Sequence, residues 1–460
     1  MKEPIPQTPN RFVAIFGGAV SGAEAASQLA EKGFKVVVFD QNALPYGKIE
    51  DGLPKWHHKL RDKEEQKINE KLSHPLVSYV PNIRLGSDLS VTEIARDWGF
   101  SAVLLAVGAW RDRPLPIEGI DEYIHQGLYY QNPFIYWYNH RHEPNYQGIV
   151  YDTPDDAIIV GGGLASLDVA KVLMFDNVEK ALRARGIETN LFELDRSIAK
   201  VLEKHQLTLD DLGIKGCTLY YRRRIKDMPL STMATDTPEQ LEKAEKTREK
   251  ILNNYQSKYL FNIAPNHAPV DKIVENGRLM GLVFQETEFK DGRLVNIEGA
   301  LKEVRGSVVI SSIGSIPESI QGIPMDGQVY KIIYEECCKV DGFQNVFALG
   351  NAVTGRGNIN ESSKHGKEIT EQIVEKYLSQ EGESAMYKEV FEDRESQISF
   401  HTNKIMDKIS LTKPLSIEQM QELDQKVSEL QQKVGYTGTF QQWVDKHLPL
   451  RLEEMIDLEH

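Results

Sequence analysis

Two glycine-rich runs in the sequence have the spacing of turns that hold a nucleotide diphosphate. The first run lies between an apolar stretch at 12–16 and an alanine-rich stretch at 23–32, which predicts a strand, a turn and a helix. Glycine allows the tight turn, and the start of the helix presents free backbone N–H groups to a pyrophosphate. The candidate binding residues of this turn are Gly17, Gly18, Ala19, Val20, Ser21 and Gly22.

The residues after the next predicted strand, 35–39, add a second part of a nucleotide site. Asp40 ends this strand, where a carboxylate can accept hydrogen bonds from ribose hydroxyls, and Gln41 follows it. Ala19 stands where the fingerprint has its middle glycine, and because its methyl group is small we expect a displaced backbone and not a lost site. The alternative is a structural crossover whose glycines serve packing alone.

The second glycine run, 161–166, repeats the device after an apolar strand at 157–160. Its candidate binding residues are Gly163, Leu164, Ala165 and Ser166. A later strand at 217–221 leads directly into Arg222, Arg223 and Arg224. Three guanidinium groups at such a strand end suit a ribose 2′-phosphate by charge and by bidentate hydrogen bonding, which favours NADPH over NADH. The alternative is a solvated basic turn.

Composition narrows the class of protein. The 460 residues carry a formal net charge of −14, which makes nucleic acid an improbable partner. No apolar stretch approaches the roughly 20 residues of a membrane span, and the N-terminus lacks the apolar core of a signal peptide. The three cysteines, Cys217, Cys337 and Cys338, form no C-x-x-C pair, which favours the reducing cytoplasm and disfavours a dithiol, cluster or metal centre.

The alternation of strands and helices predicts an α/β protein with two Rossmann-like domains, the NADP-binding domain inserted in the FAD-binding domain, and a C-terminal helical extension. The expected boundaries are 1–116 and 317–400 for the FAD-binding domain, 117–316 for the NADP-binding domain and 401–460 for the extension. A charged helix is expected at 237–260, capped by Asp236 or Thr237. Apolar residues at helical spacing between Met420 and Val434 predict a helix that packs on its own body or on a second subunit.

Four stretches resemble the adrenodoxin-reductase-like branch of the ferredoxin–NADP reductases, which is related to the small subunit of glutamate synthase. They span roughly residues 12 to 380. The stretches are the first turn with 45–54, the segment 106–109 with 115–119, the segment 136–139 with 161–170, and the segment 311–314 with 348–352 and 355–359. The third is the most specific. Asn351 departs from the aspartate that many related flavoproteins carry.

The resemblance implies FAD at the first turn and NADP at the second. It adds flavin-side candidates, namely Lys48, Leu53, Lys55, Leu89, Ala106, Val107, Gly108, Gly350, Asn351, Gly357, Asn358 and Ile359. His57 is a candidate for tuning the flavin ring, with His58 beside it, and Asp168 matches a family aspartate implicated in proton traffic. These two, His57 and Asp168, are the catalytic candidates, and no metal is expected. For the histidines the alternative is a surface loop, and for Asp168 it is a structural carboxylate.

Three functions follow from these features. The first is hydride transfer from NADPH to FAD and electron transfer to a small redox protein such as a ferredoxin. The second is an electron-input subunit or a reductase of a small molecule such as a quinone, and the third is a non-enzymatic redox sensor. The acidic chain counts against a ferredoxin unless one face is basic, since ferredoxins are typically acidic. The sequence leaves the oligomeric state open, and an oligomer is possible.

Overall fold

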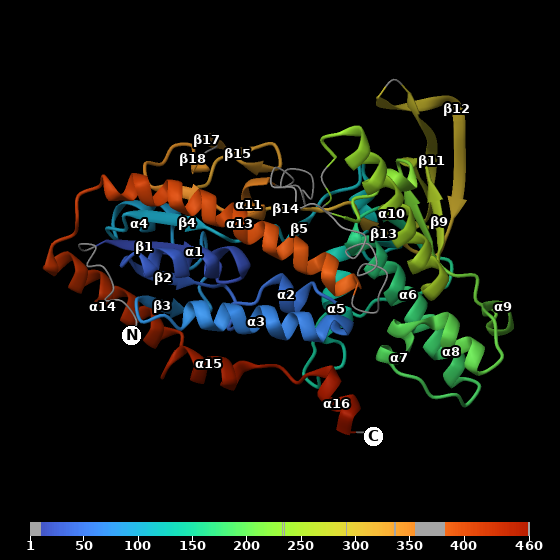
Figure 1. Cartoon of the computed structure of the whole chain (residues 1–460), viewed down its shortest axis with the longest axis horizontal. Coiled ribbons are helices and arrows are strands. Elements are labelled where there is room, and N and C mark those ends of the chain that lie inside the picture. Colours follow the sequence, from blue (N-terminus) through green and yellow to red (C-terminus); the bar gives the residue numbers. More distant parts are fainter. Residues whose placement is uncertain are drawn as a thin grey trace.

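The computed structural model of the chain describes residues 11–231, 233, 235–290, 292–334, 337–354 and 382–458. Two sheets lie toward opposite ends of the molecule, and helix α13 (Gly382–Ser410) extends along the first toward the second (Figure 1).

Among the described residues the first sheet has seven strands, in the order β17-β18-β19-β4-β1-β2-β3. Five of them run parallel, and β17 and β18 are antiparallel additions at one edge. Strand β1 is buried on both faces, so its alternate side chains enter two cores. The strands are β1 (Phe12–Phe16), β2 (Lys35–Phe39), β3 (Val77–Val80), β4 (Ala102–Leu105), β17 (Ile332–Tyr334), β18 (Lys339–Val340) and β19 (Val346–Ala348).

Helices α1 and α3 belong to one face of this sheet, and α13 packs along α1. The short helix α2 lies beside α3 and places the segment that follows it next to the second half of the molecule. The helices are α1 (Val20–Glu31), α2 (Lys48–Asp51), the 3-10 turn η1 (Lys55–His57), α3 (His58–Leu72), α4 (Val91–Arg96) and α11 (Asn351–Thr354).

The second sheet has five parallel strands in the described part of the chain, in the order β6-β13-β7-β8-β9. Its strands are β6 (Leu128–Tyr130), β7 (Ile158–Gly161), β8 (Thr218–Tyr221), β9 (Asn262–Pro265) and β13 (Val309–Ser312). Its helices are α5 (Gln131–His140), α6 (Leu164–Arg183), α7 (Leu191–Arg196), α8 (Ile198–Lys204), α9 (Leu209–Leu212), α10 (Pro238–Tyr259) and the 3-10 turn η3 (Ile225–Asp227).

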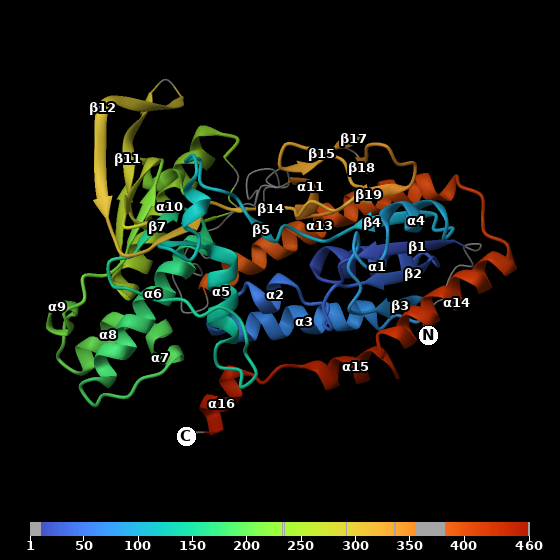
Figure 2. The same cartoon turned by 180° about the vertical axis from the view of Figure 1, so that it is seen from behind.

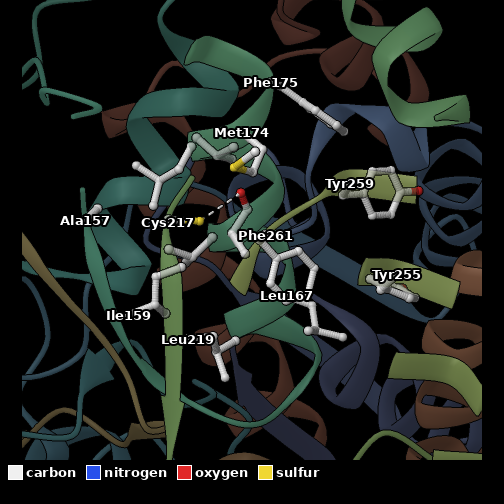
Figure 3. Packing of buried hydrophobic residues seen from close by; sticks show 14 of the residues in the cluster. Ala157, Ile159, Leu167, Met174, Phe175, Cys217, Leu219, Tyr255, Tyr259 and Phe261 are labelled. Carbon is white, nitrogen blue, oxygen red and sulfur yellow. Dashed lines mark hydrogen bonds between the residues drawn. The ribbon is translucent and has the colours of Figure 1, made fainter. Parts of the chain in front are cut away.

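One core of the second sheet packs strand residues such as Ile159 and Leu219 against α6 and α10 (Figure 3). Cys217 lies in this core, where its thiol donates to the carbonyl of Ala170 and burial raises the pKa of the thiol to about 12. This cysteine is therefore a structural, unreactive thiol at neutral pH.

The other face of the second sheet is covered by an antiparallel sheet, which was not predicted from the sequence. It contains β10 (His267–Glu275), β11 (Arg278–Lys290) and β12 (Arg293–Arg305), and its β11–β12 hairpin projects from the body (Figure 2). Leu279, Leu282 and Phe284 of β11 fill the core beneath it.

Two chain segments connect the sheets and pair with each other, β5 (Arg111–Asp112) with β14 (Ser315–Ile316). The 3-10 turn η2 (Ile120–Tyr123) follows the first connection, and the hairpin of β15 (Met325–Asp326) and β16 (Val329–Tyr330) follows the second. Because the strands of the second sheet fall between strands of the first in sequence, one nucleotide fold is inserted in the other, as predicted. The residue boundaries given above stay a prediction.

The C-terminal extension is helical and packs on the body. It comprises α14 (Ile417–Lys433), α15 (Phe440–His447) and α16 (Leu452–Leu458), which run alongside β3 and α3 (Figure 1). Leu423 and Val427 of α14 are buried in the core of the first sheet, so the predicted apolar face docks on its own chain. The predicted cap of the charged helix is confirmed, with Thr237 capping α10. No helix among the described residues is long and apolar enough to cross a membrane.

Candidate functional site

The first glycine turn joins β1 to α1 and leaves no room for side chains at two positions. Gly17 has a φ of +98°, and a Cβ there would lie 2.5 Å from the carbonyl oxygen of Ala106. A Cβ on Gly22 would lie 1.8 Å from the carbonyl oxygen of Gly17. Both positions therefore require glycine, because any larger residue would push the turn and the helix away from the sheet. Ala19 is the N-cap of α1, and no side chain caps the free N–H groups there.

Asp40 closes one end of this turn. Its Oδ2 accepts a hydrogen bond of 2.8 Å from the N–H of Gly18, and its Oδ1 accepts one from the N–H of Asn42. Burial raises the pKa of Asp40 to about 6, although both hydrogen bonds favour the charged form. The carboxylate is thus oriented at the β2 end of the cavity, with lone pairs that can accept from ribose hydroxyls.

A cavity lies against this turn and is lined by twelve of the flavin-side candidates. They are Gly17, Ala19, Val20, Ser21, Asp40, Gln41, Lys48, Leu53, Ala106, Val107, Gly108 and Asn351. Gly18 and Gly22 shape the turn without lining the cavity, and Gly350 lines the neighbouring one. The candidates come from the carboxyl ends of β1, β2, β4 and β19 and from α2, because parallel strands end at one edge of the sheet.

Lys48 lies where the cavity meets the connection between the sheets. Its Nζ donates to Oδ1 of Asn132 at 2.9 Å and to Oγ of Ser315 at 3.0 Å, so it links α2 to both the second fold and β14. Burial lowers the pKa of Lys48 to about 8, against the attraction of Asp112. Burial also raises the pKa of Asp112 to about 6.

The second glycine turn joins β7 to α6 and lines a second cavity. Gly163, Leu164 and Ala165 line it, with Gly163 as the N-cap of α6. A Cβ on Gly162 would lie 2.3 Å from the ring of Tyr221, so the turn is pressed against the end of β8. Ser166 is fully buried and donates to the carbonyl of Gly163, so it supports the turn and does not face the cavity.

The three arginines after β8 have different positions. Arg222 and Arg223 are exposed and line the second cavity. Arg224 does not line it, because both its Nε and Nη2 donate to the carboxylate of Asp227, at 2.8 Å and 2.6 Å, and its guanidinium stacks on Phe289. Arg224 is thus engaged by Asp227 and Phe289 and its role in binding stays a prediction, whereas Arg222 and Arg223 face the second cavity.

The catalytic candidates lie together, behind the cavities. His57 and Asp168 are buried, and His57 Nε2 is 4.0 Å from Asp168 Oδ1. Neither residue lines either of the two cavities described above. Tyr387 of α13, which donates to Asp168, lines both of them. Trp56 Nε1 donates to Nε2 of His57 at 3.0 Å, and Nδ1 of His57 lies 3.3 Å from Oγ of Ser384.

Other candidates lie elsewhere. The Nζ of Lys55 donates to Oε1 of Glu50 at 2.7 Å in a buried ion cluster. Lys55 was expected on the flavin side, but it does not line the first cavity. Leu89 does not line the first cavity and its side chain is buried in a core of the first sheet, so its contact with a flavin stays a prediction. Gly357, Asn358 and Ile359 lie outside the described residues.

Several lining residues were not predicted. Helix α13 contributes Tyr387, Val390 and Arg394 to both cavities, and Trp110, Gln131 and Asn132 come from the connection and from α5. Since Gln131, Ala165, Gly314 and Asn351 also line both cavities, the two cavities adjoin. The residues of α13 have helical spacing, which marks one face of a helix but does not tell which surface that face meets.

Comparisons with known proteins agree with this arrangement. Residues 11–215 match the model of the pyridine nucleotide-disulphide oxidoreductase family. The chain is 28% identical to NADPH:adrenodoxin oxidoreductase, mitochondrial, of Arabidopsis thaliana, over 68% of this chain and 69% of that protein. It is 23% identical to NADPH-ferredoxin reductase FprA of Mycobacterium tuberculosis, over 84% of this chain and 88% of that protein.

A solved structure of FprA from Mycobacterium tuberculosis in complex with NADPH has a TM-score of 0.61 to the chain, at 18% identity, with 92% of this chain and 91% of that chain covered. A mutant of the same protein has a TM-score of 0.64, at the same identity and coverage. At this identity the structural likeness shows a shared fold.

Proposed function

We propose that the chain, which is homologous to the adrenodoxin and ferredoxin reductases and matches the pyridine nucleotide-disulphide oxidoreductase family over residues 11–215, transfers electrons from NADPH through FAD to a ferredoxin-like protein. One observation carries the proposal: two nucleotide-type cavities, each built on a glycine turn, adjoin and share lining residues. Such an arrangement lets two bound cofactors meet at their reactive ends, which is what hydride transfer requires.

The residues of the first cavity fit FAD. The cradle at Gly17 and Gly22 holds the turn close to β4, and the free N–H groups at the start of α1 can bind a diphosphate. Asp40 is placed for ribose hydroxyls. FAD supplies the chemistry of accepting a hydride and releasing single electrons, and the chain supplies binding and orientation.

The residues of the second cavity fit NADPH. The start of α6 at Gly163 can bind the diphosphate, and Arg222 and Arg223 stand at the end of β8, where the ribose 2′-phosphate of NADPH would be recognised by charge. Because no C-x-x-C pair exists in the sequence, we infer that electrons leave for an external acceptor.

We propose a positioning role for His57 and Asp168. They sit behind Tyr387, whose hydroxyl donates to Asp168 and whose side chain lines both cavities. The pair can hold Tyr387 in place and keep a proton-bearing group next to the junction. Substitution of Asp168 by Asn should then slow reduction by NADPH without loss of bound FAD, which rapid-mixing absorbance measurements can test.

We also propose a cytoplasmic location. The three cysteines are free and buried, as expected of a reducing compartment. The Arabidopsis thaliana relative is named as mitochondrial, so cell fractionation with immunodetection is the deciding test. Recovery of the protein with mitochondria or another organelle would contradict the proposal.

The function is tested by cytochrome c reduction with the purified flavoprotein. With NADPH present, the rate should rise and saturate as ferredoxins of the source organism are added. NADH should support a much lower rate at the same concentration. Equal rates with and without every ferredoxin tested would contradict a ferredoxin-type acceptor.

A further inference from the structure

Helix α13 presents one polar and charged face to the junction of the two cavities. Tyr387, Val390 and Arg394 lie on one side of the helix and line both cavities, and Asp393 and Gln397 line only the second. The helix extends past α2 toward the second sheet in both views (Figures 1 and 2). Arg394 is thus a cationic side chain at the boundary between the flavin-side and nicotinamide-side cavities.

The positive charge of Arg394 has no ion-pair partner among the residues that the structure describes. Within the described ranges, no carboxylate lies within ion-pair distance of its guanidinium, although its neighbour Asp393 exerts a weaker attraction. Burial lowers the pKa of Arg394, so the site disfavours the charge. Arg394 is half-buried and stays charged at neutral pH, and no ion pair with another described residue compensates its desolvation.

A second cation faces the same space. Lys48 hydrogen bonds to the neutral groups of Asn132 and Ser315, and its charge and that of Arg394 repel each other. The nearby acid, Asp112, has a raised pKa because it is buried, and the N–H of Asn132 donates to it. Asp112 and Asp393 offset these two charges at a distance, but neither forms an ion pair with Arg394, whose guanidinium donors can therefore bind an anion.

We propose that Arg394, which lines both cavities, binds the diphosphate of one of the two dinucleotides from the side of α13, and so acts as an anchor that neither glycine turn provides. This inference rests on the proposed function, because FAD and NADPH each bring a diphosphate to these cavities. Guanidinium is suited to the task, since its planar donors match phosphate oxygens bidentately.

The test compares Arg394→Gln with Arg394→Lys and with Lys388→Gln. Lys388 lies on the same helix and forms an exposed ion pair with Glu392, so its substitution controls for changes in helix charge. The dissociation constants to measure are those of FAD for the apoprotein, and of NADP⁺ and adenosine 2′-monophosphate for the holoprotein. The last compound can engage Arg222 and Arg223 but carries no diphosphate.

Arg394→Gln should raise the dissociation constant of either FAD or NADP⁺ by about tenfold to a hundredfold, as expected for loss of a charge-assisted hydrogen bond. The nucleotide that weakens identifies which phosphate is bound. Arg394→Lys should recover part of the lost affinity. Lys388→Gln should bind both dinucleotides as the unmodified protein does, and the affinity for adenosine 2′-monophosphate should not change in any variant. Unchanged affinity for both dinucleotides, or equal weakening of the monophosphate, would overturn the inference. Failure of the unmodified protein to bind NADP⁺ would instead overturn the proposed function.

Discussion

At the scale of residues, we expect substitutions of the three adjacent arginines after β8 to affect cofactor preference differently. Replacing Arg222 and Arg223 together by Ala should lower the ratio of kcat/KM for NADPH to that for NADH by about tenfold or more, because each removes a charge-assisted hydrogen bond to the 2′-phosphate. Arg224→Ala is the matched control, since Arg224 is held by Asp227 and should leave the ratio nearly unchanged. An equal fall in the control would contradict the assignment.

Asp40 predicts a pH dependence of stability in the apoprotein. Its pKa is raised from 3.8 to about 6 by burial, so the folded state holds this proton more tightly than the unfolded state. Stability contributed by the protonated form is therefore present below about pH 4 and is lost as pH rises toward 6, by on the order of 3 kcal/mol. The stability of the unmodified protein relative to Asp40→Asn should fall over this range in urea unfolding. A relative stability that rises with pH would contradict the buried environment.

The sequence was most informative where a single residue type is sterically required. Gly17 and Gly22 could be assigned because a Cβ at either position would overlap backbone. Arg224 could not be separated from its neighbours, because its role depends on Asp227 and on Phe289 of a hairpin that was not predicted. Lys55 was misplaced for the same reason, since its partner Glu50 is fixed by tertiary contacts.

At the scale of elements, the C-terminal segment holds the flavin-side helix α2. Arg451 pairs with Glu50 of α2 and with Glu65 of α3, where Arg451 Nη2 is 2.8 Å from Glu65 Oε2, and all three residues are buried. Burial and the neighbouring Glu50 raise the pKa of Glu65, whereas Lys55 and Arg451 hold the pKa of Glu50 below its ordinary value against its burial. The same helix α2 contributes Lys48 to the cavity, so this cluster connects the chain's C-terminal segment to the flavin side.

Arg451→Met should therefore destabilise the protein by about 3–5 kcal/mol, because it removes one of the cations from a buried cluster in which Glu50 then keeps only Lys55 and Glu65 keeps only Arg61. It should also speed the loss of FAD, since α2 is released. Urea unfolding and flavin fluorescence measure the two effects. Glu454→Ala, an exposed position of α16, is the control and should change neither. Unaltered stability of the Arg451 variant would show that the cluster is not structural.

The strands beside the two glycine turns, expected at 12–16, 35–39, 157–160 and 217–221, could be placed from sequence to within one residue, because buried parallel strands are short apolar runs, whereas β3, β6 and β9 were not predicted. The antiparallel β10–β12 sheet could not, since much of β12 is exposed and carries many charges. Helix α13 was not predicted, and its contacts with both cavities depend on how it packs along α1.

At the scale of the whole molecule, one nucleotide fold is inserted in the other, and the two are connected through the paired strands β5 and β14. Hydrogen bonds among Lys48, Asn132 and Ser315 stabilise this connection. This connection holds the two cavities next to each other. The two glycine motifs could not predict that arrangement, because neither motif contains information on the position of the other. The central claim is thus that one chain binds a flavin and a nicotinamide nucleotide in contact.

Anaerobic titration of the purified protein with NADPH tests this claim most directly. We expect the protein to carry FAD and about one equivalent of NADPH to bleach the flavin absorbance, whereas NADH should do so far more slowly at equal concentration. Absence of flavin in protein refolded or reconstituted with FAD, or a flavin that NADPH leaves oxidised, would contradict the account.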